Sequence, residues 1–306
     1  DSDEVQAGTD AAKMSPSRAV SETFEPGSVG KVISMSGYLQ MGLHKMSDQL
    51  SVPDHITQEG QTYKDSFDHG TERWTLAGIL QNSSNVGMIM AGENYPDEQR
   101  YEYLTKFGIG QPTGLNLPGE SSGLLTNPSA WDLRTRNTIL FGQGYTVNAL
   151  QLNNVVATIA NKGVKQQQSI IKSTTDANGK TTESKKGEAT RVVDEKVASD
   201  MMNAMESVAE GYNKFVKVDG YRMAAKSGTA EVQGSDGTLS SIISDYSVVI
   251  PADNPRYAVT VVMKDPNGVF GGLTAGPVSA QICEFLMQKY EVPVSGPRKN
   301  AIPVTW

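Results

Sequence analysis

The spacing of apolar residues predicts a helix that begins near Ser28. Apolar positions recur three or four residues apart from there, at Val32, Met35, Leu39 and Leu43. This spacing places them on one face of a helix. Gly30 and Gly37 lie within the helix at a cost of about 1 kcal/mol each. We therefore expect a neighbouring backbone or a ligand to approach closely at these glycines.

Three further helical segments follow from the same kind of pattern. Residues 74–95 read as two helical pieces joined by the polar run "NSSN", and residues 148–161 and 194–209 read as single helices. Residues 107–131 are dense in Gly, Pro and Ser, which predicts a loop. The first two thirds of the chain are therefore expected to be mainly helical.

The last third changes to strand-like patterns. The runs "YRMAAKSGTAEVQ", "DYSVVIPAD" and "RYAVTVVMKDP" are separated by turn residues and predict an antiparallel meander. Asp245, at the start of the second run, is expected to be a turn residue. Residues 174–187 predict a hairpin around Asn178-Gly179, and a closing helix is expected over 278–289. Helices first and strands later indicate an α+β fold.

Composition limits the partners, disulfides and membrane spans that the chain can have. The 306 residues carry a net charge of -7 and no basic stripe, so nucleic acid is not an expected partner. The single cysteine, Cys283, cannot form a disulfide within the chain and is expected to be buried. No apolar run approaches the roughly 20 residues that span a bilayer. The start is polar and has no initiator Met, so any membrane anchor is expected upstream.

No metal or cofactor site is predicted. His44, His55 and His69 do not have the spacing of metal ligands, so surface or supporting roles are expected for them. Trp74 and Trp131 are expected to pack in the core rather than line a cleft.

The first candidate for chemistry is the pair Ser28 and Lys31. Side chains at positions i and i+3 of a helix lie about 5–6 Å apart on one face. A serine hydroxyl becomes a nucleophile when a base removes its proton, and a neutral lysine amine can be that base. Alone, the pair is more typical of a helix N-cap followed by a solvated lysine.

Two further motifs change this interpretation. Ser83-Ser84-Asn85 is the only Ser-x-Asn in the chain, and Lys226-Ser227-Gly228 is its only Lys-(Ser/Thr)-Gly. Their order and separation match the three-part signature of penicillin-recognising serine enzymes. The predicted contexts also match: a helix start, a loop between helices, and a strand.

From about Arg18 to Tyr290, the chain resembles the transpeptidase domain of class B penicillin-binding proteins, the D,D-transpeptidases that cross-link peptidoglycan. The likeness extends to "FEPGS", "LQNSSNVG", "FGIGQPTGLNLPGE", "FGQGYTVNALQLNNVVATIANKG", "MAAKSGTAE" and "GGLTAGPV", and the division-associated branch fits best. It implies the penicillin-recognising serine transpeptidase fold, in which helices flank an antiparallel sheet and an all-helical subdomain adjoins it. The transpeptidase domain would fill residues 1–306, with its helical part at about 28–165 and its sheet part at about 165–292.

The resemblance implies a role for each residue of the first two motifs. Ser28 would attack the penultimate D-Ala carbonyl of a stem peptide ending in D-Ala-D-Ala, and Lys31 would be its general base. Ser83 would relay protons to and from the amine. Asn85 would bind the substrate amide and orient Lys31. β-Lactam antibiotics would acylate Ser28 as strained mimics of the same amide.

The third motif would bind the substrate. Lys226 would keep the local field positive, which favours the neutral form of Lys31 by like-charge repulsion. The Ser227 and Thr229 hydroxyls would hold the substrate's terminal carboxylate, and Gly228 would let the strand approach the substrate backbone. The backbone N–H groups of Ser28 and Thr229 would form the oxyanion hole.

The chain also departs from the family pattern. Gly30 stands where a bulkier residue is common, so a looser helix start is expected, and Ser227 replaces the commoner threonine. The N-terminal strand that completes the family's sheet is not recognisable before Ser28. We therefore expect that strand, a pedestal domain and a single membrane anchor upstream of residue 1. The catalytic domain would then lie outside the cytoplasm, with a glycosyltransferase and division proteins as partners.

Two other functions share these motifs. A serine β-lactamase or penicillin sensor would use the same nucleophile, although the Glu-x-x-Leu-Asn pattern of one such hydrolase class is absent. A catalytically silent scaffold of the division complex would keep the fold for partner binding alone.

Overall fold

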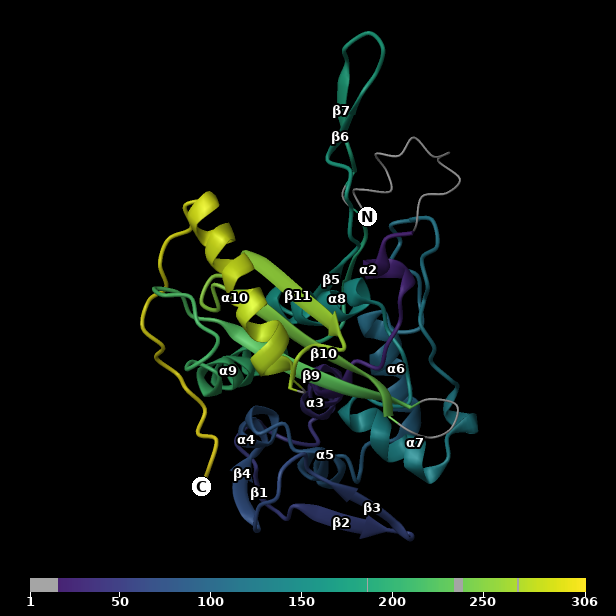
Figure 1. The fold of residues 1–306 in the computed structure, drawn as a ribbon, viewed down its shortest axis with the longest axis vertical. Coiled ribbons are helices and arrows are strands. Elements are labelled where there is room, and N and C mark those ends of the chain that lie inside the picture. The colour runs from purple at the N-terminus through teal and green to yellow at the C-terminus, as the bar shows by residue number, and fades with distance from the viewer. Residues whose placement is uncertain (1–15, 186, 234–238, 269) are drawn as a thin grey trace.

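The computed structural model describes residues 16–185, 187–233, 239–268 and 270–306. In the view of Figure 1, an antiparallel sheet of three long strands lies above a group of helices. A long hairpin projects from the top of the molecule, away from those helices. The prediction that no family strand precedes Ser28 concerns mainly residues 1–15, which lie outside the described residues. Arg18–Ser21 forms a short helix rather than a strand.

The first half of the chain combines helices with short strands. Its elements, in chain order, are α2 (Arg18–Ser21), η2 (Gly27–Gly30), α3 (Lys31–Gln40), β1 (Gln49–Val52), β2 (His55–Gln58), β3 (Gln61–Lys64), β4 (Glu72–Thr75), α4 (Leu76–Gln81), α5 (Asn85–Ala91), α6 (Asp97–Phe107), η3 (Pro128–Ala130), α7 (Leu133–Thr138), η4 (Ile139–Phe141) and α8 (Ala149–Ala160).

The second half contains the main sheet. Its elements are β5 (Val164–Gln166), β6 (Ser173–Thr175), β7 (Thr181–Glu183), β8 (Ala189–Arg191), α9 (Glu195–Gly211), β9 (Ala224–Gln233), β10 (Leu239–Ile250), β11 (Tyr257–Lys264) and α10 (Gly271–Lys289). The predicted meander is confirmed, because β9, β10 and β11 pair antiparallel in the order β11-β10-β9. The predicted hairpin is confirmed as β6 and β7, which extend away from the body (Figure 1).

Helices cover both faces of this sheet. In Figure 1, α10 crosses its front face and α8 lies behind it. Along β9, successive side chains alternate between the faces, so Lys226 and Gly228 share one face while Ser227 and Thr229 point to the other. The strand pairing places Ser247 opposite Lys226. The α+β interpretation is therefore correct.

The helix that carries the first motif lies at the centre of the molecule. It begins as the tight turn η2 and continues as α3, whose residues from Lys31 to Tyr38 are all buried. A Cβ at Gly30 would overlap the Tyr145 hydroxyl oxygen and the Cα of Gly142. The expectation of a looser helix start was wrong, since close packing around Gly30 makes this start tight.

Two features of the fold were missed in the sequence. Residues 49–75 form β1 to β4 as two antiparallel pairs, so the region around the helices is not all-helical. These strands have four residues each and mostly exposed side chains, which leaves little periodic signal. The closing helix α10 begins at Gly271, seven residues before the expected start at 278.

The early start of α10 has a packing reason. A Cβ at Gly271 would overlap the carbonyl oxygens of Asp245 and Gly228, and one at Gly272 would overlap the Tyr212 ring. Gly271 is therefore required by close contact with the sheet and Gly272 by close contact with Tyr212 at the end of α9, and neither by a turn. Pro277 lies inside the helix, where it removes one backbone donor; together these residues look like a loop in the sequence.

The predicted burial of two tryptophans and the cysteine is confirmed. Trp74 and Trp131 are each 4% exposed, and Cys283 is fully buried. In the described part of the chain, no helix is long and apolar enough to cross a membrane.

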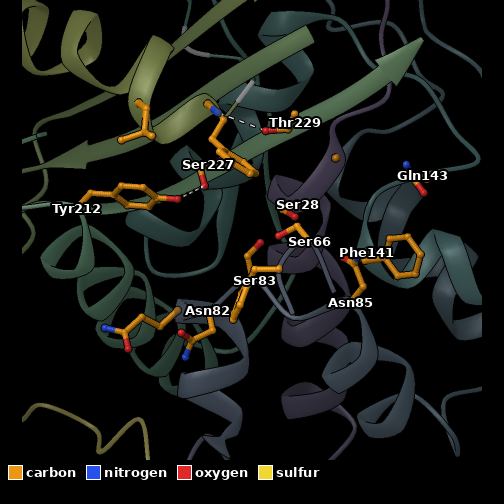
Figure 2. Close-up of a pocket in the computed structure, with 16 residues that line it drawn as sticks. Ser28, Ser66, Asn82, Ser83, Asn85, Phe141, Gln143, Tyr212, Ser227 and Thr229 are labelled. Carbon is orange, nitrogen blue, oxygen red and sulfur yellow. Dashed lines mark hydrogen bonds between the residues drawn. The ribbon is translucent and has the colours of Figure 1, made fainter. Parts of the chain in front are cut away.

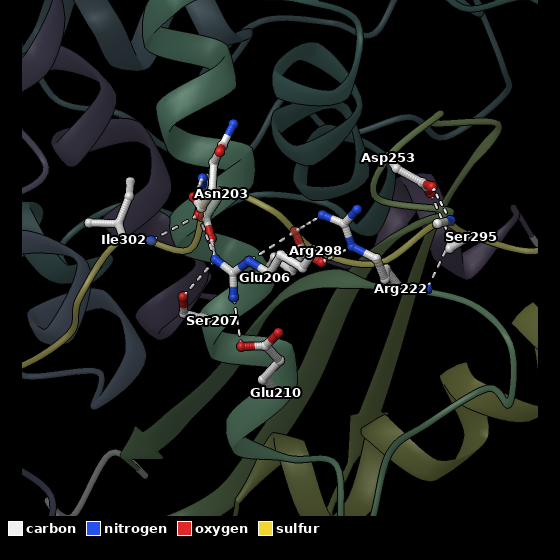
Figure 3. A network of polar contacts seen from close by, with 11 residues as sticks. Asn203, Glu206, Ser207, Glu210, Arg222, Asp253, Ser295, Arg298 and Ile302 are labelled. Carbon is white, nitrogen blue, oxygen red and sulfur yellow. Dashed lines mark hydrogen bonds and ion pairs between the residues drawn. The ribbon is translucent and has the colours of Figure 1, made fainter.

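The C-terminal segment contacts elements from both halves of the chain. After α10, the chain returns along α9, where the Arg298 guanidinium binds Glu206, Glu210 and Asn203 (Figure 3). It then reaches β4, where the Thr75 N–H donates to the Val304 carbonyl at 3.1 Å. This contact braces the start of α4, the helix that leads into the second motif.

Candidate active site

The turn before α3 brings Ser28 to the surface of the cleft. Gly27 adopts a left-handed φ of 51°, which glycine tolerates without a steric penalty. A Cβ at Gly27 would overlap the Thr229 backbone. The first and third motifs are therefore in direct contact, although about 200 residues separate them in the chain.

Lys31 is a buried lysine that contacts the candidate nucleophile. Its side chain is 0% exposed, and its Nζ lies 2.7 Å from Ser28 Oγ. The same Nζ lies 2.8 Å from the Ser83 carbonyl oxygen and 2.7 Å from Asn85 Oδ1. The solvated-lysine interpretation is wrong, because water does not reach this amine.

These three contacts are compatible with a neutral amine, and burial favours that form. The Ser83 carbonyl and the Asn85 amide oxygen can only accept hydrogen bonds. A neutral Lys31 donates its two N–H bonds to them and keeps its lone pair for the Ser28 hydroxyl proton. Burial, followed by repulsion from Lys226, holds the pKa of Lys31 well below its ordinary value, while the charge of Asp65 opposes the shift.

The second motif reaches Lys31 through a sharp turn between α4 and α5. Ser83 has a left-handed φ of 58°, which directs Ser83 and Asn85 toward Lys31. Ser84 points the opposite way, and its Oγ caps α5 by accepting from the Gly87 N–H at 2.8 Å. Asn85 Nδ2 donates to the Lys64 carbonyl, which orients the amide with its oxygen toward Lys31.

The third motif places a second buried lysine beside the same serine. Lys226, 0% exposed, donates from Nζ to Ser83 Oγ at 2.9 Å and to the Ser227 carbonyl at 3.0 Å. The Ser83 hydroxyl therefore lies between two amines, because Lys31 Nζ is 3.4 Å from it. Burial lowers the pKa of Lys226 to about 7, and the charge of Asp245 partly opposes this shift.

The other side chains of the third motif, Ser227 and Thr229, also have hydrogen-bond partners at the cleft. Ser227 Oγ lies 3.1 Å from the Tyr212 hydroxyl, and Thr229 Oγ1 accepts from the Gly271 N–H at 3.3 Å. Figure 2 shows Ser28, Ser83 and Asn85 gathered opposite the strand that carries Ser227 and Thr229. Five predicted site residues therefore line one cleft, namely Ser28, Ser83, Asn85, Ser227 and Thr229, and the buried Lys31 and Lys226 contact Ser28 and Ser83.

Asp245 is not the turn residue that we expected. It lies in the middle of β10, opposite Gly228, and is 0% exposed. A Cβ at Gly228 would overlap both of its carboxyl oxygens, so the glycine makes room for this acid. Neither oxygen has a hydrogen-bond partner among the described residues. Burial raises the pKa of Asp245 well above its ordinary value, which favours the neutral acid.

Sequence reasoning missed the walls of the cleft. The cavity has a volume of about 390 Å³, and its missed lining residues include Ser66, Phe67, Tyr212, Phe270 and Leu273. Phe67, Phe270 and Leu273 are 43%, 48% and 49% exposed, so the walls offer apolar surface to a ligand. They come from turns and a helix start, where no periodic pattern marks them.

The three histidines do not gather. No group of three or more His, Cys, Asp or Glu side chains that could hold a metal ion occurs within the residues described. His55 is largely exposed beside Asp54. His69 is instead buried against Asp65, directly behind the second motif.

A serine hydroxyl in contact with a buried, neutral lysine defines the site of a serine acyltransferase or hydrolase. The chain belongs to the family described as the penicillin binding protein transpeptidase domain, which matches residues 3–284. The family resemblance and the fold class inferred from the sequence are thereby confirmed.

Curated relatives of this chain carry names from the same family. Penicillin-binding protein PbpB of Mycolicibacterium smegmatis is 33% identical over 302 residues, covering 94% of this chain and 47% of that protein. Peptidoglycan D,D-transpeptidase FtsI of Escherichia coli K12 is 35% identical over 271 residues, covering 87% of this chain and 44% of that protein. The chain thus spans a little under half the length of these relatives.

Solved structures show the same fold. A peptidoglycan synthetase from Bifidobacterium adolescentis has a TM-score of 0.93 and 69% identity, covering 98% of this chain and 55% of that one. Penicillin binding protein 3 from Mycobacterium tuberculosis, complexed with ampicillin, has a TM-score of 0.87 and 33% identity, covering 94% of this chain and 67% of that one.

Proposed function

We propose that this chain is the catalytic part of a peptidoglycan D,D-transpeptidase that cross-links stem peptides ending in D-Ala-D-Ala. The observation that carries the proposal is the 2.7 Å contact between Lys31 Nζ and Ser28 Oγ, with two acceptor oxygens occupying the amine's N–H bonds. The relatives named D,D-transpeptidase and the ampicillin complex of a relative support the substrate class and acylation by β-lactams.

The first half-reaction forms an ester. Ser28 Oγ attacks the carbonyl carbon of the penultimate D-Ala while its proton moves to the Lys31 lone pair. The backbone N–H groups of Ser28 and Thr229 stabilise the oxyanion, and one such donor is typically worth roughly 3–4 kcal/mol. Ser83 then passes its hydroxyl proton to the leaving nitrogen and takes the proton that Lys31 holds, the C–N bond breaks, and the terminal D-Ala departs as a neutral amine that water can protonate.

The second half-reaction forms the cross-link and regenerates the free enzyme. An amine from a second stem peptide attacks the ester carbon, and its surplus proton passes through Ser83 toward the lysines. The C–O bond to Ser28 breaks, and the Ser28 oxygen regains a proton from Lys31. The product is a new amide between two stem peptides, so the reaction needs neither metal nor redox cofactor.

The third motif binds the carboxylate that both D-Ala-D-Ala and β-lactams carry. Hydroxyls at Ser227 and Thr229 face the cleft as donors, and Lys226 behind them supplies positive charge when it is protonated. Asn85 binds the substrate amide and holds Lys31. The contact between Tyr212 and Ser227 supports a fixed direction for the Ser227 hydroxyl.

The proposal extends to the whole protein from which this chain comes. A domain with its helical part at about 28–165 and its sheet part at about 165–292 would be preceded by the remaining family strand, a pedestal domain and a membrane anchor. The greater length of the relatives supports this arrangement. It implies a catalytic domain outside the cytoplasm that works with a cell-wall glycosyltransferase and division proteins.

Intact-mass spectrometry after penicillin treatment tests the nucleophile. We expect a single penicilloyl adduct on the native chain and none on Ser28→Ala. An adduct that persists in Ser28→Ala would contradict the proposal. Rapid loss of the native adduct would instead identify a β-lactamase, because a transpeptidase deacylates slowly with water.

A further inference from the structure

Behind the second motif lies a buried acid that the reaction above does not use. Asp65, which directly follows β3, has a side chain only 1% exposed. Its Oδ2 accepts from the Ser84 hydroxyl at 2.6 Å, and its Oδ1 accepts from the backbone N–H groups of Asn85 at 2.6 Å and Val86 at 3.0 Å. One carboxylate therefore holds three consecutive residues of the turn that faces Lys31.

His69 completes this group from the other side. Its Nε2 lies 3.0 Å from Asp65 Oδ2, and its Nδ1 lies 2.7 Å from the Gly70 carbonyl oxygen. A carbonyl and a carboxylate can only accept hydrogen bonds, so both contacts are satisfied only by the doubly protonated ring. The ring centroid is 5.0 Å from those of Phe67 and Trp74, which fix its position.

The charges around His69 agree with this protonation. Burial alone would lower the pKa of His69, but the hydrogen bonds to Asp65 and Gly70 and the charges of Asp65 and Asp54 raise it above its ordinary value. Phe67 and Trp74, the other groups packed on the ring, are uncharged. The contacts and the raised pKa both favour an imidazolium at His69, paired with the side chain of Asp65.

A continuous set of contacts connects this pair with the nucleophile's base. Asp65 holds the backbone of Asn85, and Asn85 Oδ1 lies 2.7 Å from Lys31 Nζ. We propose, on the basis of the proposed function, that Asp65 and His69 are positioning residues that hold the Ser83–Asn85 segment against Lys31. Through the opposite charges of the pair, they also set how readily Lys31 takes the Ser28 proton.

Two variants separate this role from that of a simple helix cap. Asp65→Asn removes the negative charge but keeps one acceptor oxygen for the turn. Because Asp65 opposes the lowering of the Lys31 pKa, its loss moves the acid limb of the acylation profile to lower pH. His69→Gln keeps a donor to Asp65 but removes the positive charge, which moves the same limb to higher pH.

The measurement is the second-order rate of acylation by a fluorescent penicillin as a function of pH, with the melting temperature measured beside it. Asp65→Asn is expected to be about ten- to a hundredfold slower at its optimum, with a limb shift of up to about one pH unit. The matched control is His55→Gln, whose exposed ring contacts the adjacent Asp54 just before β2; it should leave rate and limb unchanged.

Opposite limb shifts in the two variants support the inference. A uniform fall in rate with the limb unmoved, or shifts in the same direction, overturns it and leaves Asp65 as a helix cap. If Asp65→Asn does not fold, His69→Gln decides the matter alone, since an unmoved limb overturns the inference. The proposed function itself would fail on a different result. Penicillin would then not label the native protein, or would still label Ser28→Ala.

Discussion

The two lysines of the cleft are both fully buried, but their surroundings differ. Lys31 contacts acceptor oxygens of Ser83 and Asn85, and Asp65, the acid whose charge acts on the Lys31 pKa, accepts hydrogen bonds on both oxygens. Lys226 lies on a strand near Asp245, whose oxygens have no hydrogen-bond partner in the described residues. Asp65 thus accepts hydrogen bonds on both oxygens, whereas burial favours the neutral form of Asp245.

The difference separates two tasks that one residue type performs here. Lys31 is held neutral by geometry and burial, as a base must be before it takes a proton. Lys226 has a pKa of about 7, so its charge changes close to neutral pH. We infer that the helix side of the cleft supplies a fixed base, and the strand side a positive charge that depends on pH.

The largest effect is expected from Lys31→Met. This variant preserves an apolar stem in a buried position but removes the amine that takes the Ser28 proton. General bases typically contribute about 10²–10⁴-fold, so we expect the acylation rate with penicillin to fall by about that factor. Stopped-flow or gel labelling measures the rate, and Lys217→Met, at an exposed lysine, is the control. A loss below tenfold would show that Lys31 is not the base.

Lys226→Met tests the strand side. The charge of Lys226 is lost as pH rises through about 7, so native acylation should decline on the alkaline side from about that pH. We expect the variant to be about a hundredfold slower below pH 7, in line with the loss of a charge-assisted contact, and to lack this decline. The measurement is the pH profile of acylation. An alkaline decline that survives in Lys226→Met belongs to another group.

Much of this site could be predicted from the sequence, because local patterns carry it. The periodicity after Ser28 gave the central helix, and the three motifs gave five polar side chains that meet in one cleft. The strand runs gave the sheet, since β10 and β11 are rich in Val and Ile. These features depend on spacing within short segments, which is what a sequence displays.

The remaining features depend on tertiary contacts. Asp245 looked like a turn residue because the polar "SDYS" hid the continuation of β10, and only the pairing with Gly228 explains its burial. Asp65 and His69 act from an irregular loop whose partners lie on α5. Phe270 and Gly271 are placed by the packing of α10 on the sheet. No periodic pattern marks any of these positions.

Gly228→Ala examines the contact between the strand and its acid. A methyl group there would overlap both Asp245 oxygens and the Pro26 carbonyl, so β9 must shift relative to the Ser28 turn. We expect roughly a tenfold slower acylation and a destabilisation of about 1–3 kcal/mol, the usual range for overpacking. The rate and the denaturation midpoint test this. Adding Asp245→Ala should restore part of both losses, and no restoration would mean that Asp245 does not cause the clash.

The smallest effect is expected from Asp245→Asn. If burial keeps this acid neutral, the amide replaces one uncharged group by another, and the acylation rate at pH 6 to 7 should change by less than about threefold. What remains of its charge raises the pKa of Lys226, so the variant's alkaline decline should begin at a lower pH. Asp219→Asn, at an exposed carboxylate beside Lys217, is the control and should leave the profile unchanged. A large loss of rate, together with a decline displaced far toward lower pH, would mean that Asp245 is ionised and is the true counter-charge of Lys226. The two lysines would then be balanced in the same way, each by a carboxylate, and the distinction between a fixed base and a pH-dependent charge would no longer hold.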